Sequence, residues 1–211
     1  MSSARFEPHE IDREGAARAV DLARHAGISL DAPRERAVVE ALGAAGAAVL
    51  PSLLRAHGLT ETLARELDTR GVIEPASVPS PLFARGSAPD LVAAKRALRR
   101  MRDEALVRTA LRELYAAVDV DATAREWSVV ADRCTAWALA AAEVIVEARN
   151  GPPRDARGAR CPFVVLGMGK LGGHELNLGS DIDVCFFYGT DEGSAGTRTL
   201  NQHFARVGDG A

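Results

Sequence analysis

The chain has 211 residues, of which 47% are hydrophobic, and its formal net charge is −3. This length allows one or two domains with a sizeable core, and the slightly acidic balance gives no overall signal for nucleic-acid binding. No apolar run approaches the ~18 residues that a membrane span needs, and the N-terminus lacks a secretory signal. We therefore predict a cytoplasmic protein that binds neither nucleic acid nor a membrane.

The cysteines and histidines do not form a metal-binding pattern. Cys134, Cys161 and Cys185 are scattered and odd in number, so they indicate neither a zinc site nor a disulfide framework. This usage fits a reducing cytoplasm. The histidines have no ligand spacing, and we expect all of them on the surface or in turns: His9, His25, His57, His174 and His203.

Residues 1–155 are predicted to form a helical region that is interrupted by a proline-rich loop at about 72–89. Alanine is abundant in this region and favours helices. Apolar spacing, caps and breakers predict five helices, at about 9–26, 33–51, 60–71, 90–114 and 123–148. In the last of these, Trp127 and Trp137 are expected to anchor the core.

The predicted helix at 90–114 has a strongly basic face. Its apolar residues recur at threes and fours, whereas the other face carries Lys95, Arg96, Arg99, Arg100, Arg102, Arg108 and Arg112. One interpretation is a solvated face that is partly paired with neighbouring acidic residues. The other is a surface that faces an anion, near a phosphate site or toward an acidic partner. The pattern alone leaves both open.

The most informative stretch is Phe163–Tyr188, which follows a polar connector at 154–160. Its two apolar runs, 163–166 and 184–188, are predicted strands that flank a glycine-rich turn and an Asp-x-Asp pair. Alternate strand residues share a face, so Asp181 and Asp183 are expected to point the same way. Neighbouring carboxylates are costly unless a cation neutralises them, and oxygen ligands suit Mg²⁺ or Mn²⁺.

The glycine turn has two functional interpretations. Gly167–Gly172 matches the dinucleotide fingerprint G-x-G-x-x-G, but that site needs a helix of ~10 or more residues before the next strand. Turn residues occupy much of this interval instead. In a nucleotidyltransferase, a glycine turn admits a phosphate chain, and an Asp-x-Asp about a dozen residues later holds metals. A third possibility is a tight loop with two solvated aspartates.

The string from Gly167 to Asp183, GMGKLGGHELNLGSDID, resembles the signature of the glutamine synthetase adenylyltransferase/adenylyl-removing enzymes. A weaker similarity extends over roughly the last 120 residues, and nothing before Asp90 matches specifically. The resemblance implies a polymerase-β-like nucleotidyltransferase, with Asp181 and Asp183 as catalytic metal ligands. It also implies a nucleotide- and phosphate-binding turn that comprises Gly169, Lys170, Gly172, Gly173 and Ser180. Two roles stay open for Lys170: it balances phosphate charge, or it is only a solvent-exposed residue of the turn. Two roles also stay open for Ser180: it binds phosphate, or it caps the start of the strand.

The resemblance also implies the reaction and its partners. Family enzymes attach AMP from ATP to a tyrosine of glutamine synthetase, and remove it by phosphorolysis to give ADP, which regulates nitrogen assimilation. If Met1 is the true start, this chain is the N-terminal, adenylyl-removing part; attachment of AMP is the alternative. Glutamine synthetase, ATP or ADP, phosphate and a PII-type nitrogen signalling protein are the implied partners.

The expected fold is α+β: a helical region followed, at 160–211, by the start of a nucleotidyltransferase domain with a mixed sheet and helices. The resemblance implies a third carboxylate beyond residue 211, so the domain is predicted to be truncated and inactive by itself. A non-catalytic nucleotide- or partner-binding fragment is the alternative. After Tyr188 we expect a polar loop at 189–196, a helix at about 197–207 and a structureless tail.

Overall fold

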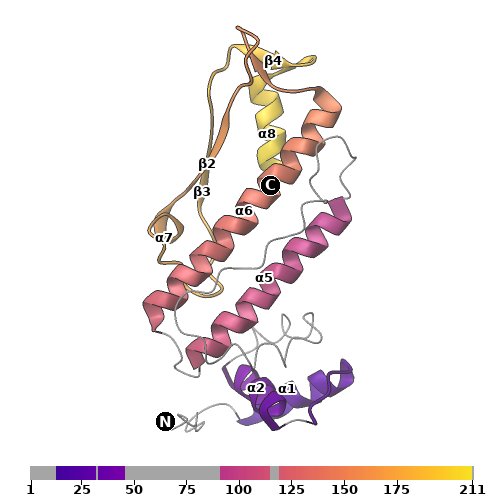
Figure 1. Cartoon of the computed structure of the whole chain (residues 1–211), viewed down its shortest axis with the longest axis vertical. Helices are drawn as coiled ribbons and strands as arrows, with labels where there is room; N and C mark the ends of the chain where they lie inside the picture. The colour runs from indigo at the N-terminus through magenta and orange to yellow at the C-terminus, as the bar shows by residue number, and fades with distance from the viewer. Residues whose placement is uncertain (1–12, 32, 46–90, 115–118, 211) are drawn as a thin grey trace. The chain divides into compact units, whose positions relative to one another are not determined.

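The computed structural model describes residues 13–31, 33–45, 91–114 and 119–210. They form two compact units. Unit 1 comprises the described residues among 1–75, 100–130 and 174–181, and unit 2 those among 76–99, 131–173 and 182–211. The long helices α5 (Leu91–Leu114) and α6 (Val120–Asn150) each contribute residues to both units (Figure 1). The predicted domain boundary near residues 155–160 stays a prediction. The predicted helix at 60–71 and the predicted loop at about 72–89 lie outside the described residues.

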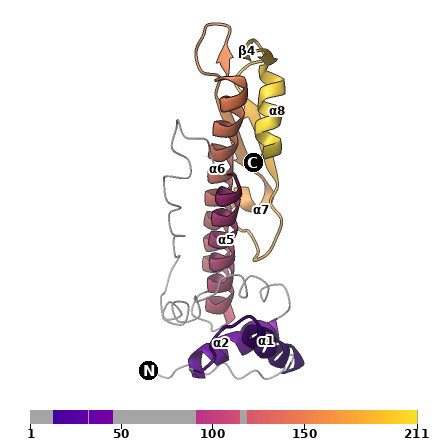
Figure 2. The same ribbon diagram turned by 90° about the vertical axis from the view of Figure 1, so that its right-hand side faces the viewer.

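Unit 1 contains a small apolar core built by helices. Helices α1 (Arg13–His25) and α2 (Pro33–Ala45) pack against each other (Figures 1 and 2). Val107 and Ala110 of α5 complete the core. Its buried members from the first two helices are Ala19, Val20, Ala23, Val38, Val39 and Leu42. The predicted first helix is confirmed over Arg13–His25, and so is the start of the second at Pro33. The predicted start of the first helix at residue 9 and the predicted end of the second at residue 51 lie outside the described residues.

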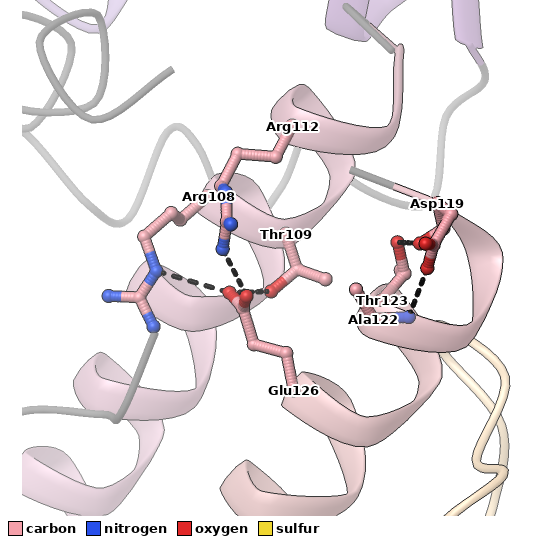
Figure 3. Close-up of polar contacts among 7 residues, drawn as sticks. All are labelled: Arg108, Thr109, Arg112, Asp119, Ala122, Thr123 and Glu126. Atoms are coloured by element: carbon pink, nitrogen blue, oxygen red, sulfur yellow. Dashed lines mark hydrogen bonds and ion pairs between the residues drawn. The ribbon is translucent and has the colours of Figure 1, made fainter. Parts of the chain in front are cut away.

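A buried ionic cluster joins α5 to α6 within unit 1 (Figure 3). The carboxylate of Glu126 accepts hydrogen bonds from Arg112 and from the Thr109 hydroxyl, the latter at 2.8 Å. Arg108 Nε lies 3.4 Å from the same carboxylate. The side chains of Arg112 and Glu126 are 0% and 1% exposed. The solvated-face interpretation is therefore wrong for Arg112, whereas Arg100 and Arg102 are exposed as it predicts.

Helix α6 starts at Val120, three residues before the predicted start at Thr123. The physical reason is a cap: the Asp119 carboxylate accepts the backbone N–H of Ala122 at 2.7 Å (Figure 3). Trp127 is buried, as predicted for a core anchor, whereas Trp137 is only half-buried.

Unit 2 contains two small antiparallel sheets. Strands β2 (Phe163–Gly167) and β3 (Val184–Tyr188) form one pair, which confirms both predicted strands. The second sheet has the order β1-β4-β5, with β1 at Arg154–Asp155, β4 at Gly193–Ala195 and β5 at Arg198–Thr199. The sequence interpretation of 154–160 and 189–196 as strand-free segments is therefore wrong. Strands of two or three residues show no apolar alternation that a sequence could reveal.

Helix α8 (Leu200–Gly210) lies along the C-terminal part of α6 and closes the core of unit 2 (Figures 1 and 2). Leu200, Phe204 and Val207 are buried, and the Phe204 ring stacks on Phe163 with a centroid distance of 4.9 Å. Two expectations are wrong. The helix continues through the predicted tail, and His203 is buried because it shares the inward face of α8.

The mixture of helices with small antiparallel sheets confirms the predicted α+β class. None of the helices in the described part of the chain combines the length and the hydrophobicity that a membrane crossing requires.

Candidate active site

The β2–β3 pair carries the glycine turn and the second aspartate at one end. In its register Gly167 lies opposite Val184. The backbone N–H of Met168 then donates to the carbonyl oxygen of Asp183 at 2.8 Å, so the pairing continues one step beyond the strands. The glycine turn leaves β2 at the point where Asp183 enters β3. The structure therefore brings the turn and this carboxylate together.

The turn itself folds into one helical turn, α7 (Gly169–Gly172). Gly169 has φ +51°, a left-handed conformation that favours glycine, and a Cβ there would lie 3.7 Å from Asp183 Oδ2. At Gly172 a Cβ would lie only 2.6 Å from the Gly167 carbonyl oxygen, so the backbone leaves no room for any side chain. Four residues of helix are far fewer than the ~10 that the dinucleotide interpretation needs.

The amides of Gly172 and Gly173 are engaged inside the turn. They donate to the carbonyl oxygens of Met168 and Gly169, each at 3.1 Å. The backbone N–H groups of the two glycines therefore stabilise the helical turn. Lys170 projects from the same turn and is exposed, whereas Leu171 is buried and fastens the turn to the interior of unit 2.

The segment 174–181, which we call the acidic loop, belongs to unit 1. Leu176 is buried, and its backbone N–H donates to the Ser128 hydroxyl of α6 at 3.1 Å. Leu178 packs against the apolar core of unit 1. The Ser180 N–H donates to the Asn177 carbonyl oxygen at 3.0 Å, and Asp181 follows as the last residue of the loop. No sequence signal pointed to Ser128, because a single serine in a helix has no motif.

Asp181 and Asp183 do not lie within a strand. Strand β3 begins at Val184, and residues 181–183 have an irregular backbone, so the alternation argument for their common direction does not apply. Both aspartates are exposed, and among the described residues neither carboxylate forms an ion pair.

The donor set fits a hard divalent cation. Carboxylate oxygens suit Mg²⁺ or Mn²⁺, and Mg²⁺ is typically held by one or two carboxylates together with waters and substrate phosphates. Within the described part of the chain, no group of three His, Cys, Asp or Glu side chains lies close enough to hold a metal by itself.

Comparison with known proteins shows which family this chain resembles. A family model described as glutamate-ammonia ligase adenylyltransferase matches residues 42–209. The chain belongs to this family. The match begins well before Asp90, so the similarity to the family covers more of the chain than the sequence motifs indicate.

Several relatives of the adenylyltransferase family are named bifunctional glutamine synthetase adenylyltransferase/adenylyl-removing enzyme. The protein from Burkholderia pseudomallei is 39% identical over 127 residues, which cover 58% of this chain and 14% of the relative. The protein from Xanthomonas campestris pv. campestris is 34% identical over 196 residues, which cover 90% of this chain and 20% of the relative. The chain thus spans a fifth or less of these relatives. Its α+β architecture is consistent with a nucleotidyltransferase fragment.

Proposed function

We propose that this chain supplies metal- and phosphate-binding residues to a nucleotidyltransferase that acts on glutamine synthetase. One observation carries the proposal: the β2–β3 pair holds the Asp183 side chain next to Gly169 of the glycine turn. Family membership and the names of the relatives support the same function. A dinucleotide site is disfavoured because the helix after the turn is too short.

Each residue of the site has a distinct part in this proposal. Asp181 and Asp183 would hold Mg²⁺ or Mn²⁺, which, when bound, neutralises phosphate charge and stabilises the entering and leaving oxygens. Gly169 lets the backbone approach the phosphate chain, and Lys170 contributes positive charge beside it. Gly172 and Gly173 place no side chain at their own positions in the turn. The Ser180 hydroxyl would donate a hydrogen bond to a phosphate oxygen.

For the direction of the reaction we propose phosphorolytic removal of AMP from the adenylylated tyrosine. The substrates are then adenylylated glutamine synthetase and inorganic phosphate, and the products are ADP and the free tyrosine, whose oxygen leaves as phosphate attacks phosphorus. The names of the relatives give both activities, so attachment of AMP from ATP is the second candidate. A PII-type signalling protein is proposed as a regulatory partner.

The test of the site is a titration of the chain with ADP in the presence and absence of Mn²⁺. Asp183→Asn should abolish metal-dependent nucleotide binding and leave the helical circular dichroism signal unchanged. Asp209→Asn is the matched control, because it neutralises another exposed aspartate of unit 2 that lies in α8. Equal binding by the wild type and Asp183→Asn would contradict the metal-site assignment.

The direction is tested in a longer protein that contains this chain. With Asp181→Asn and Asp183→Asn together, release of ADP from adenylylated glutamine synthetase and phosphate should be lost, and attachment of AMP should persist. Loss of attachment with retained removal would reverse the assignment.

We also propose that the 211-residue chain has no appreciable turnover alone, because a two-metal site needs a further carboxylate besides Asp181 and Asp183. Turnover of ATP or of adenylylated glutamine synthetase by the purified chain would contradict this. Nucleotide binding without turnover in the longer protein would favour a non-catalytic binding module.

A further inference from the structure

A buried hydrogen bond joins the acidic loop to α6, between the Leu176 backbone and the Ser128 side chain. The Ser128 hydroxyl accepts the Leu176 N–H at 3.1 Å and donates to the Ala124 carbonyl oxygen at 2.8 Å. Ser128 is 0% exposed and Leu176 is 1% exposed, so water does not compete for this contact. The hydroxyl uses its one donor within the helix, and this leaves its oxygen facing the loop.

Helix α6, which carries Ser128, is itself bonded to α5 close to this residue. Glu126, two residues before Ser128, lies in the buried ionic cluster with Arg112 and Thr109 of α5. The turn of α6 that carries Ser128 is therefore tied to α5 by charge-assisted hydrogen bonds. A connected series of contacts runs from α5 through α6 to the Leu176 amide, all of it inside unit 1.

The hydrogen bond between Ser128 and Leu176 restrains the acidic loop, which ends at the metal-binding candidate Asp181. Leu176 lies five residues before Asp181, and the Ser180 N–H closes a turn onto Asn177 between them. A loop with one buried backbone anchor has fewer accessible conformations than a free loop of the same length. Fixing Leu176 thus limits where Ser180 and Asp181 can lie.

We propose that Ser128 is a positioning residue for Asp181, the first aspartate of the Asp-x-Asp pair. By accepting the Leu176 N–H, it holds the acidic loop in the conformation that presents Ser180 and Asp181 to a metal-bound nucleotide. The inference rests on the proposed function, because it assigns Ser128 a part in the same site. Leu176 and Leu178 supply the apolar contacts of the loop, and Ser128 fixes its backbone.

The test compares Ser128→Ala with a matched control, Thr123→Val. Thr123 is also buried in α6 and also donates its hydroxyl to the backbone carbonyl four residues earlier, at 3.0 Å from Asp119 O. It makes no hydrogen bond with the acidic loop within the described structure. Both substitutions remove a buried helical hydroxyl, and only the first removes the partner of Leu176. Ser128→Thr retains the hydroxyl and serves as the conservative rescue.

Two measurements on the 211-residue chain decide the outcome. The first is hydrogen exchange of the Leu176 amide, which needs no ligand. Ser128→Ala should accelerate it roughly tenfold, since a buried amide loses its acceptor, and Thr123→Val should not. The second is the affinity for ADP with Mn²⁺, which should fall about five- to thirtyfold in Ser128→Ala because fewer molecules present a competent loop. Ser128→Thr should recover most of both effects.

The failures of the two proposals have different signatures. Unchanged exchange in Ser128→Ala overturns the anchoring role, whatever the affinity. Faster exchange with unchanged Mn²⁺-dependent affinity shows an anchor that does not position the site, and it also overturns the inference. If the wild type binds no Mn²⁺–ADP while exchange still responds to Ser128→Ala, the proposed function fails, and the positioning role fails with it.

Discussion

Removing the negative charge of Glu126 should destabilise unit 1 far more than removing that of Glu104, a half-buried glutamate of the same helix pair whose arginine partner is exposed. The carboxylate contacts Arg112, whose side chain is 0% exposed, and it also accepts from Thr109. Breaking a buried ion pair by neutralising one partner costs about 3–5 kcal/mol, because a charge stays buried without its counter-charge. Glu126→Gln preserves the shape of the side chain. We therefore expect the free energy of unfolding to fall by about 3 kcal/mol, the lower end of this range.

The matched control is Glu104→Gln in α5. Glu104 accepts a hydrogen bond from Arg100 at 2.6 Å, but the Arg100 side chain is 68% exposed. Exposed pairs at this helical spacing contribute only about 0.3–0.5 kcal/mol. The two substitutions change the same chemical group in an Arg–Glu pair, so the difference between them measures the effect of burial.

Urea denaturation followed by tryptophan fluorescence suits this comparison. The sequence has two tryptophans, and a Trp137→Phe background leaves only Trp127, the neighbour of Glu126 in the chain. The variant Arg112→Met combined with Glu126→Gln should cost less than the sum of the single substitutions, because each single change already breaks the pair. If Glu126→Gln costs no more than Glu104→Gln, the burial argument is wrong.

Burial lowers the pKa of His203 below its usual 6.5, so the unfolded chain binds the proton more tightly than the folded chain does. The free energy of unfolding should therefore decrease as the pH falls below about 6.5. Urea titrations at several pH values should show this decrease, and His203→Gln should remove it. The hydrogen bond to Asp191 raises the pKa of the Tyr188 phenol above 10.0, so Asp191→Asn should lower the midpoint of its ultraviolet titration. Gly172→Ala should destabilise the glycine turn by about 1–3 kcal/mol, seen as a lower urea midpoint, because its Cβ would meet the Gly167 carbonyl oxygen at 2.6 Å.

The sequence predicts the regular elements that have a strong periodic signal. Strands β2 and β3 are continuous apolar runs, and α5, α6 and α8 carry apolar residues at helical spacing, so their type follows from local pattern alone. The motif from Gly167 to Asp183 also identifies the family, because its residue types and spacing are unusual as a set. A periodic pattern, however, does not mark which polar residue on a helix lies against another helix.

The tertiary structure decides the environment of the polar side chains. Arg112 belongs by composition to an exposed basic face, yet it is buried because α6 places Glu126 opposite it. His203 is buried because it lies between Leu200 and Phe204 on the inward face of α8. The glycine turn lies next to Asp183 because the antiparallel register pairs Gly167 with Val184. Each outcome depends on residues that are distant in sequence, and burial there makes a partner obligatory because water no longer solvates the charge or the amide.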